Sequence, residues 1–338
     1  MGGDFAPANT VAGAVAAIRE SGGRLSVVLV CQQDLISAEL KKPENQVAPM
    51  EGALCSITNA GEVIEMRDSP TAALKTKRDS SIAIGLSLHK DKKVDAFVSA
   101  GNTGAVLSAS TLILGRLQGV GRPTIGALLP TAKEPCLLVD AGANVDCKPR
   151  HLFEFGVMGS IYVNAMLGRV RPRVGLLSIG EEETKGNEAS LEALALFRKS
   201  KLNFIGNVEG RDVLGGGVDV IVCDGFVGNI LLKFGESIPE FFKSKSLSFA
   251  SRSIVNKITA LVARKGLRSV MKELDYQEHG GVPLLGVNGV SIIGHGRSTP
   301  KAIKNMVYRA EEMVRHQVSS LIETTMVEYR VIQTVQGL

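Results

Sequence analysis

This sequence lacks the features that mark several common classes of protein. Its five cysteines are widely spaced and include no CxxC pair, so neither a disulfide framework nor a zinc site is indicated, and a reducing cytoplasm is expected. It has no apolar run of the roughly 18 residues that a membrane-spanning helix requires. It also has no basic start followed by an apolar block, which is typical of a signal peptide. These absences predict a soluble cytoplasmic protein.

Fingerprints of cofactors and metals are also missing. The glycine-rich stretches lack the GxGxxG spacing of a dinucleotide-binding turn, which disfavours a nicotinamide-dependent dehydrogenase. Asp140, Asn144 and Asp146 gather in one loop, but two aspartates and an asparagine without further acids make a weak magnesium site. An alternative role for Asp146 is to fix the loop by accepting backbone hydrogen bonds. We therefore predict neither a metal nor a cofactor.

Acidic residues are absent from one long segment. Residues 241–272 hold eight basic residues and no acid, whereas the whole chain has a net charge of +5, so the remainder is net acidic. The basicity is local, so we predict no general nucleic-acid-binding surface and no nucleic-acid partner. The eight basic residues are Lys243, Lys245, Arg252, Lys257, Arg264, Lys265, Arg268 and Lys272.

Apolar residues in this basic segment recur at helical spacing, i, i+4, i+7 and i+8. Such stripes more often pack in a core, but the many cations and nearby phenylalanines favour binding at a membrane surface. We therefore predict that residues 238–275 form an inserted amphipathic helical segment, a tip for membrane or dimer contact. The predicted membrane contacts are Phe249, Ile254, Ile258, Leu261 and Val262.

Strand signals alternate with helix signals along the rest of the chain, which indicates an α/β protein. Residues 174–179 are almost continuously apolar, and 218–224 are largely so, as is typical of strands covered by helices on both faces of a parallel sheet. We predict a single α/β catalytic domain over residues 1–338, with three α/β/α layers and a mostly parallel sheet.

A polar turn after the strand at 174–179 is the first candidate site. It delivers Lys185, Gly186 and Asn187 to a helix predicted over residues 189–197. Ligands of open parallel sheets collect beyond the carboxyl ends of the strands. The helix start and the lysine would favour an anion there, either a phosphate or a developing oxyanion. The alternative is that Lys185 is an ordinary solvated loop lysine.

Two further glycine turns follow predicted strands, after residues 95–100 and after 218–224. Each places glycines and a side-chain amide at a helix start, although a simple capped turn would look the same. If these strands are parallel to 174–179, the three turns converge on one crevice. The candidate residues are Gly101, Asn102, Thr103, Gly104, Asp224, Gly225 and Asn229.

A histidine ends the last predicted strand, at 291–295. His295 could transfer protons or donate to phosphate, with Gly296 and Ser298 beside it. A structural histidine bonded to its own loop is an equal alternative. Asn144 and Asp146 complete the predicted substrate-binding set.

Seven motifs occur in an order and spacing that resemble one known family. Over nearly the whole chain the sequence resembles the bacterial acyl-carrier-protein:phosphate acyltransferases of phospholipid synthesis, the PlsX family. The motifs are MGGDFAP, SAGNTGA, GANVDCKP, EEETKGNE, CDGFVGN, GGVPLLGVNGV and IIGHG.

The resemblance implies an enzyme that converts a long-chain acyl thioester on acyl carrier protein, with inorganic phosphate as a substrate and no cofactor, into acyl phosphate and free carrier. It implies a fold like that of isocitrate and isopropylmalate dehydrogenases, a homodimer, and a protruding helical tip that touches the inner face of the cell membrane. The product would pass to a membrane-bound glycerol-3-phosphate acyltransferase. In the family, the residues that correspond to Lys185 and Asn229 are most closely tied to catalysis.

Two positions depart from the family pattern. Family members usually begin with a short strand before MGGD, so we expect an unpaired sheet neighbour here. Arg297 and Pro300 stand where the family commonly has a serine and no proline. The rival functions are a phosphotransacetylase acting on short-chain acyl-CoA and a non-catalytic membrane scaffold that recruits carrier protein.

Overall fold

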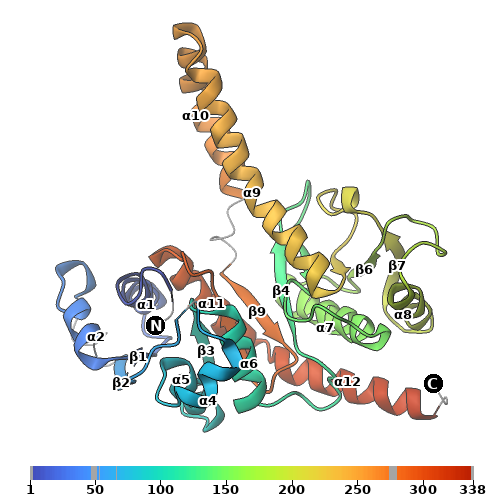
Figure 1. The fold of residues 1–338 in the computed structure, drawn as a ribbon, viewed down its shortest axis with the longest axis horizontal. Helices are drawn as coiled ribbons and strands as arrows, with labels where there is room; N and C mark the ends of the chain where they lie inside the picture. Colours follow the sequence, from blue (N-terminus) through green and yellow to red (C-terminus); the bar gives the residue numbers. More distant parts are fainter. Residues whose placement is uncertain (1–2, 47–51, 53, 66, 274–279, 336–338) are drawn as a thin grey trace.

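The computed structural model describes residues 3–46, 52, 54–65, 67–273 and 280–335, and side chains at 264–265, 267–273 and 330–335 lie outside the description. Helices and strands are interspersed along this part of the chain (Figure 1). The helices are α1 (Ala8–Ser21), α2 (Gln33–Leu40), α4 (Pro70–Thr76), α5 (Ser81–Lys90), α6 (Thr103–Ile113), α7 (Pro149–Leu167), α8 (Glu188–Arg198), α9 (Gly225–Ala250), α10 (Ile254–Glu273), α11 (Pro300–Arg315) and α12 (Val318–Val335). The strands are β1 (Val27–Cys31), β2 (Cys55–Asn59), β3 (Ala96–Ser99), β4 (Thr124–Leu129), β5 (Cys136–Val139), β6 (Arg173–Leu177), β7 (Asn203–Val208), β8 (Val220–Val222), β9 (Val282–Leu285) and β10 (Val290–Ile293).

The main sheet has eight strands in the order β3-β10-β9-β4-β5-β8-β6-β7. The pairs β3–β10, β5–β8, β8–β6 and β6–β7 are parallel, whereas the pairs on either side of β9 and the β4–β5 pair are antiparallel. The sheet is therefore mainly parallel, as predicted. The three antiparallel pairs reverse the direction of β3, β4 and β10 relative to β5, β6 and β8.

Helices cover both faces of this sheet, which confirms the predicted three-layer α/β class. One core cluster joins the apolar faces of α7, α8, α11 and α12 to Leu137 and Val139 of β5. The other joins α5 and α6 to the intervening Leu138. Alternate residues of a strand point to opposite faces of the sheet. A strand that is apolar at every position therefore needs helices packed on both faces.

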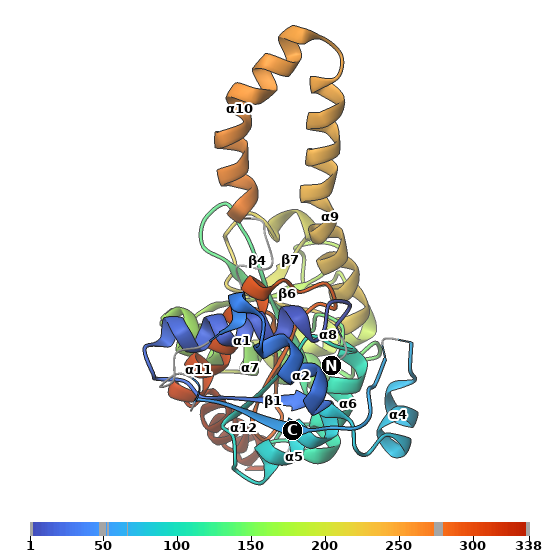
Figure 2. The same cartoon turned by 90° about the vertical axis from the view of Figure 1, so that its left-hand side faces the viewer.

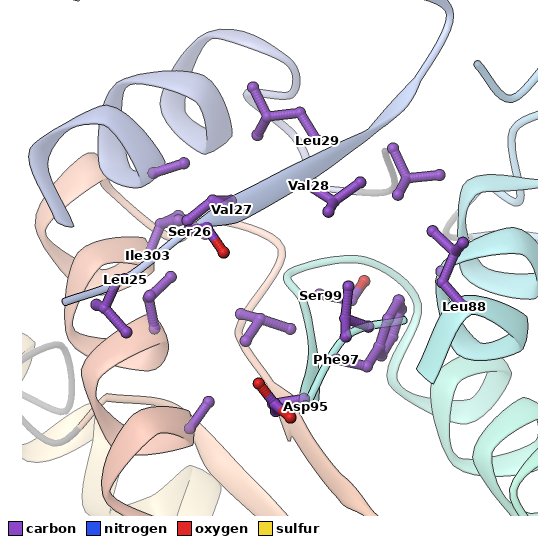
Figure 3. A pocket seen from close by; sticks show the side chains of 18 of the residues that line it. Leu25, Ser26, Val27, Val28, Leu29, Leu88, Asp95, Phe97, Ser99 and Ile303 are labelled. Carbon is purple, nitrogen blue, oxygen red and sulfur yellow. The ribbon is translucent and has the colours of Figure 1, made fainter. Parts of the chain in front are cut away.

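A second, two-stranded sheet lies beside the main one. β1 pairs in parallel with β2, while β3 pairs with β10. Between β1 and β3 lies a cavity of about 450 Å³, lined by residues of both strands, such as Val28 and Phe97, and by Ile303 of α11 (Figure 3). Within the described residues, β1 and β3 each have one sheet partner, so each is an edge strand.

The two longest helices, α9 and α10, form a hairpin that projects from the body of the molecule (Figure 2). The two helices contact each other, and the chain reverses direction between them at residues 251–253. The predicted segment 238–275 corresponds to most of this hairpin, with residues 274–275 outside the described part. At the base of the hairpin, α9 contacts strands β4 and β5 of the main sheet.

Several elements are short or interrupted. Glu62 forms an isolated bridge with Ser80. Residues 70–90 form two helices, α4 and α5, joined by a short turn. The last two helices, α11 and α12, are separated at Gln317, whose φ of 52° is incompatible with a continuous α-helix.

Candidate active site

The turn between β6 and α8 holds Lys185 in a fixed backbone conformation. Lys185 N donates to Glu182 O at 3.0 Å, and the Ser178 hydroxyl donates to Lys185 O at 3.0 Å. Gly186 has a φ of 130°, and a Cβ there would collide with the Ser190 hydroxyl, so only glycine fits. The turn is thus tightly organised around an exposed lysine.

Asn187, a candidate site residue, caps the start of α8. Asn187 Oδ1 accepts from Ser190 N at 2.9 Å, and the Ser190 hydroxyl donates to Asn187 O at 2.8 Å. Asn187 therefore acts as a helix cap in this structure. The helix dipole places positive potential at the same end of β6 as Lys185.

Asn229 lies in the first turns of α9, which begins directly after β8. The Asp224 carboxylate caps this helix by accepting from Val227 N at 2.8 Å. Gly228 packs so closely on Asp140 O that a Cβ would collide with it. A Cβ at Gly142 would lie 3.3 Å from the Asn229 Cβ, so Asn229 faces the loop after β5.

That loop is built around the buried carboxylate of Asp140. Its Oδ1 accepts from the backbone N of Ile125, Gly142 and Ala143 at 3.0 to 3.2 Å. Its Oδ2 accepts from the backbone N and the side-chain Nδ2 of Asn144, at 2.7 and 2.8 Å. Asn144 is thereby held, and Asn144 O accepts from Gly225 N at 2.7 Å. One carboxylate thus connects the ends of β5 and β8.

The strand register brings Lys185 and Asn229 to the same edge of the sheet. Leu176 of β6 is opposite Val222 of β8, and Val222 is opposite Val139 of β5. Adjacent strands are about 4.8 Å apart, so the turns after β5, β6 and β8 emerge side by side. Of the predicted residues, this edge collects Asn144, Asp146, Lys185, Gly186, Asn187, Asp224, Gly225 and Asn229.

A second group of predicted residues lies elsewhere. β3 and β10 run antiparallel to β6 and β8, so the turns that follow them leave the opposite edge of the sheet. The prediction that all three glycine turns follow strands of one direction was therefore wrong for β3. The residues concerned are Gly101, Asn102, Thr103, Gly104, His295, Gly296 and Ser298.

Several side chains in this second group have structural partners. Asn102 caps α6 by accepting from Ala105 N, and its Nδ2 donates to Glu65 O at 2.9 Å. The Ser298 hydroxyl donates to His295 O at 2.6 Å, and His295 Nδ1 accepts from Arg297 N at 3.1 Å. These bonds fit the structural alternative for His295, while Thr103 remains exposed at the start of α6. Pro300 begins α11, where a missing N–H is tolerated.

Acid–base properties argue against a cysteine nucleophile at the first group. Burial, and then the nearby Asp140 and Asp224 charges, raise the pKa of the Cys147 thiol to about 12. Burial raises the pKa of Cys223 well above its usual value. Because the thiolate is the reactive form, neither thiol is activated near neutral pH. Burial likewise raises the pKa of Asp140, although the bonds it accepts oppose that shift.

Neither a metal cluster nor a membrane span is found in the part of the chain that the structure describes. Histidine, cysteine, aspartate and glutamate do not gather there in groups of three or more able to hold a metal ion. None of the described helices is long and apolar enough to cross a bilayer.

The predicted membrane contacts are all exposed on the hairpin. Phe249 lies near the end of α9, while Ile254, Ile258, Leu261 and Val262 lie on α10, with Val262 79% exposed. Lys243, Lys245, Arg252 and Lys257 are exposed on the same hairpin. The side chains of Arg264, Lys265, Arg268 and Lys272 lie outside the described residues.

The residues that fix the Lys185 turn and the Asp146 loop were not predicted from the sequence. Ser178 and Asn207 bind the Lys185 turn, and Arg122 donates to Asp146 O at 2.9 Å. None stands in a recognisable motif. The available signal was polar character at the ends of apolar strands.

Solved structures of similar fold define the class. The phosphotransacetylase of Streptococcus pyogenes matches with a TM-score of 0.57 at 17% identity, over 91% of each chain. A branched-chain phosphotransacylase of Enterococcus faecalis matches with a TM-score of 0.56 at 14% identity, over 93% of this chain and 97% of that one. The protein therefore has the α/β fold of the phosphotransacylases.

Sequence relatives narrow the class to one family. A family model described as "Fatty acid synthesis protein" matches residues 1–321. Phosphate acyltransferase of Pelotomaculum thermopropionicum is 48% identical over 94% of this chain and 91% of its own length. The corresponding figures for phosphate acyltransferase of Chlorobaculum parvum are 47%, 95% and 96%. The chain belongs to the phosphate acyltransferase family, and it is a transferase that acts in acyl transfer to phosphate.

Proposed function

We propose that this enzyme transfers a long acyl chain from acyl carrier protein to inorganic phosphate, producing acyl phosphate and free carrier thiol for the synthesis of phosphatidic acid. One observation carries the assignment of the site: the Lys185 turn and the helix start with Asn229 leave the same edge of neighbouring strands. The family description, fatty acid synthesis, supports a fatty acyl substrate.

In the proposed reaction a phosphate oxygen attacks the thioester carbonyl. A carbon–oxygen bond forms, the carbon–sulfur bond breaks, and the sulfur leaves as a thiolate that takes up a proton. Lys185 neutralises the phosphate or the oxyanion, and Asn229 donates a hydrogen bond to the oxyanion. Loss of one such donor typically costs about 2.7 to 4 kcal/mol of transition-state stabilisation.

We propose direct attack, without a covalent enzyme intermediate. The high pKa of Cys147, about 12, supports this because it leaves a protonated thiol near the site at neutral pH. Catalysis then depends on positioning and charge. The reaction needs no cofactor, since inorganic phosphate is itself a substrate.

The proposed setting is a homodimer bound peripherally to the inner face of the cell membrane. Exposed apolar and basic side chains share the α9–α10 hairpin, a combination that favours binding to an anionic bilayer surface. There the acyl phosphate would pass to a membrane-bound glycerol-3-phosphate acyltransferase. This arrangement keeps the apolar acyl chain of the product close to the membrane.

The second candidate is a phosphotransacetylase that acts on short-chain acyl-CoA, which the similar fold of the Streptococcus pyogenes enzyme favours. The deciding experiment measures phosphate-dependent thiol release from long-chain acyl carrier protein and from acetyl-CoA at one phosphate concentration. We expect release from the carrier thioester to be at least about tenfold faster, since binding energy from the chain can be used in the transition state. Faster release from acetyl-CoA would favour the second candidate. No phosphate-dependent release from either would favour a non-catalytic scaffold.

A further inference from the structure

We propose that Asn207 is a positioning residue for Lys185. Asn207 lies on β7, and its side chain reaches from that strand to the backbone of the turn after β6. The inference rests on the proposed function, because that function gives Lys185 its role. It adds a residue that touches neither phosphate nor thioester and acts through the lysine.

Asn207 is bound to both ends of the tight turn. Its Nδ2 donates to Glu182 O at 2.9 Å and to Lys185 O at 3.4 Å. The same two residues are joined by the bond from Lys185 N to Glu182 O. A single amide group therefore fixes the separation and orientation of the two carbonyl groups that define the turn.

Ser178 supplies the second donor to this turn. Its hydroxyl donates to the same Lys185 O from the end of β6, whereas Asn207 donates from β7, the neighbouring parallel strand. The Lys185 carbonyl is thus held from two strands of the sheet. A carbonyl fixed in two directions fixes the Cα from which the lysine side chain extends.

The amide group of Asn207 is buried, and only its Nδ2 half has hydrogen-bond partners in the described residues. Asn207 is 8% exposed, and its Oδ1 is buried without a hydrogen-bond partner in the described structure. An unpaired buried acceptor costs free energy, and an apolar side chain of similar shape would avoid that cost. The two donated bonds are the gain that offsets it.

The outer side of the turn has weaker support. Arg198 pairs with Glu183, and Arg211 with Glu181, but all four side chains are about half or more exposed, so these ion pairs contribute little. A cavity of about 470 Å³, lined by Arg198, Arg211 and Asn207, opens on this side. The buried amide is therefore the inner anchor of the turn.

The first experiment compares Asn207→Ala with a matched control in the same strand. Asn203→Ala removes the same kind of bond, from Nδ2 to Arg171 O at 2.9 Å, at the opposite end of β7. We expect Asn207→Ala to lower kcat for acyl phosphate formation about 10- to 100-fold with little change in KM, because small displacements of a catalytic group have effects of this size. Asn203→Ala should change kcat by less than about twofold.

A double-mutant cycle separates positioning from general damage. If Asn207 acts through Lys185, adding Asn207→Ala to Lys185→Ala should lower kcat no further, because residues that act as a unit are non-additive. Should Asn207→Ala fail to fold by circular dichroism, Ser178→Ala provides the same cycle through the other donor.

The possible outcomes separate a failure of the positioning role of Asn207 from a failure of the catalytic role of Lys185. Independent, multiplicative losses in the cycle, or full activity of Asn207→Ala beside an impaired Lys185→Ala, would overturn the positioning role alone. Full activity of Lys185→Ala would overturn the role of the lysine and with it this inference.

Discussion

At the scale of single residues, the structure separates side chains that build the site from side chains that could act in it. Asp140 and Asn187 face backbone groups that they satisfy, whereas Lys185 and Asn229 are exposed at the sheet edge. The order of strand, turn and helix in the sequence placed Lys185 and Asn229 beside a candidate ligand site, and the family resemblance implied their catalytic role. It could not predict Asp140 or Asn207 as supports, because their partners are backbone atoms distant in sequence or in neighbouring turns.

A buried histidine gives a pH dependence that can be measured. His89 Nδ1 faces Val94 O at 3.0 Å, and its Nε2 accepts from Val290 N at 3.0 Å, an arrangement that requires the neutral ring. Burial lowers the pKa of His89 below its usual 6.5. The unfolded chain therefore binds a proton first as the pH falls, and the folded state loses stability below about pH 6.5.

The predicted result is a free energy of unfolding that declines from pH 7 to pH 5, by up to about 1.4 kcal/mol per unit from this one group. His89→Asn should be less stable at pH 7 and should show a smaller decline. Urea denaturation at several pH values measures both. An unchanged decline in the variant would mean that other groups cause it.

At the scale of elements, the α9–α10 hairpin combines exposed apolar side chains with basic ones on a projection from the body (Figure 2). Its helical spacing and charge were readable from the sequence, because both are local properties. Its projection from the body was implied by the family resemblance and not by the helical pattern alone, since the same stripes would serve equally well as buried helix faces. Only the tertiary arrangement distinguishes these two cases.

Replacing Leu261 and Val262 together with aspartate should reduce binding to anionic phospholipid vesicles about tenfold or more, because it removes apolar area and adds like charge. The matched control replaces Leu112 and Val170, both highly exposed and off the hairpin, with aspartate. Vesicle flotation measures the bound fraction. Equal binding of wild type and the hairpin variant would assign the hairpin to another contact.

At the scale of the whole molecule, strand direction decides which loops can share a site. The sequence predicted β3, β6, β8 and β10 to within a few residues at each end. It did not reveal the reversals, which arise from the antiparallel pairs at β9 and β4. β9 itself lies in a stretch rich in glycine and containing a proline, where strand signals are weak. Pairing between distant segments leaves no local signature, so the GNTG and GHG turns looked equivalent to the Lys185 turn.

Acyl phosphate formation by Lys185→Ala and Asn229→Ala tests the central claim most directly. Hydroxylamine traps the acyl phosphate made from long-chain acyl carrier protein and phosphate, with Lys199→Ala, an exposed lysine at the other end of α8, as the control. We predict that both site variants unfold at the wild-type temperature yet lose about 100- to 1000-fold in kcat, while the control keeps its activity. Near-normal turnover by both folded site variants would contradict the claim that this edge of the sheet is the active site.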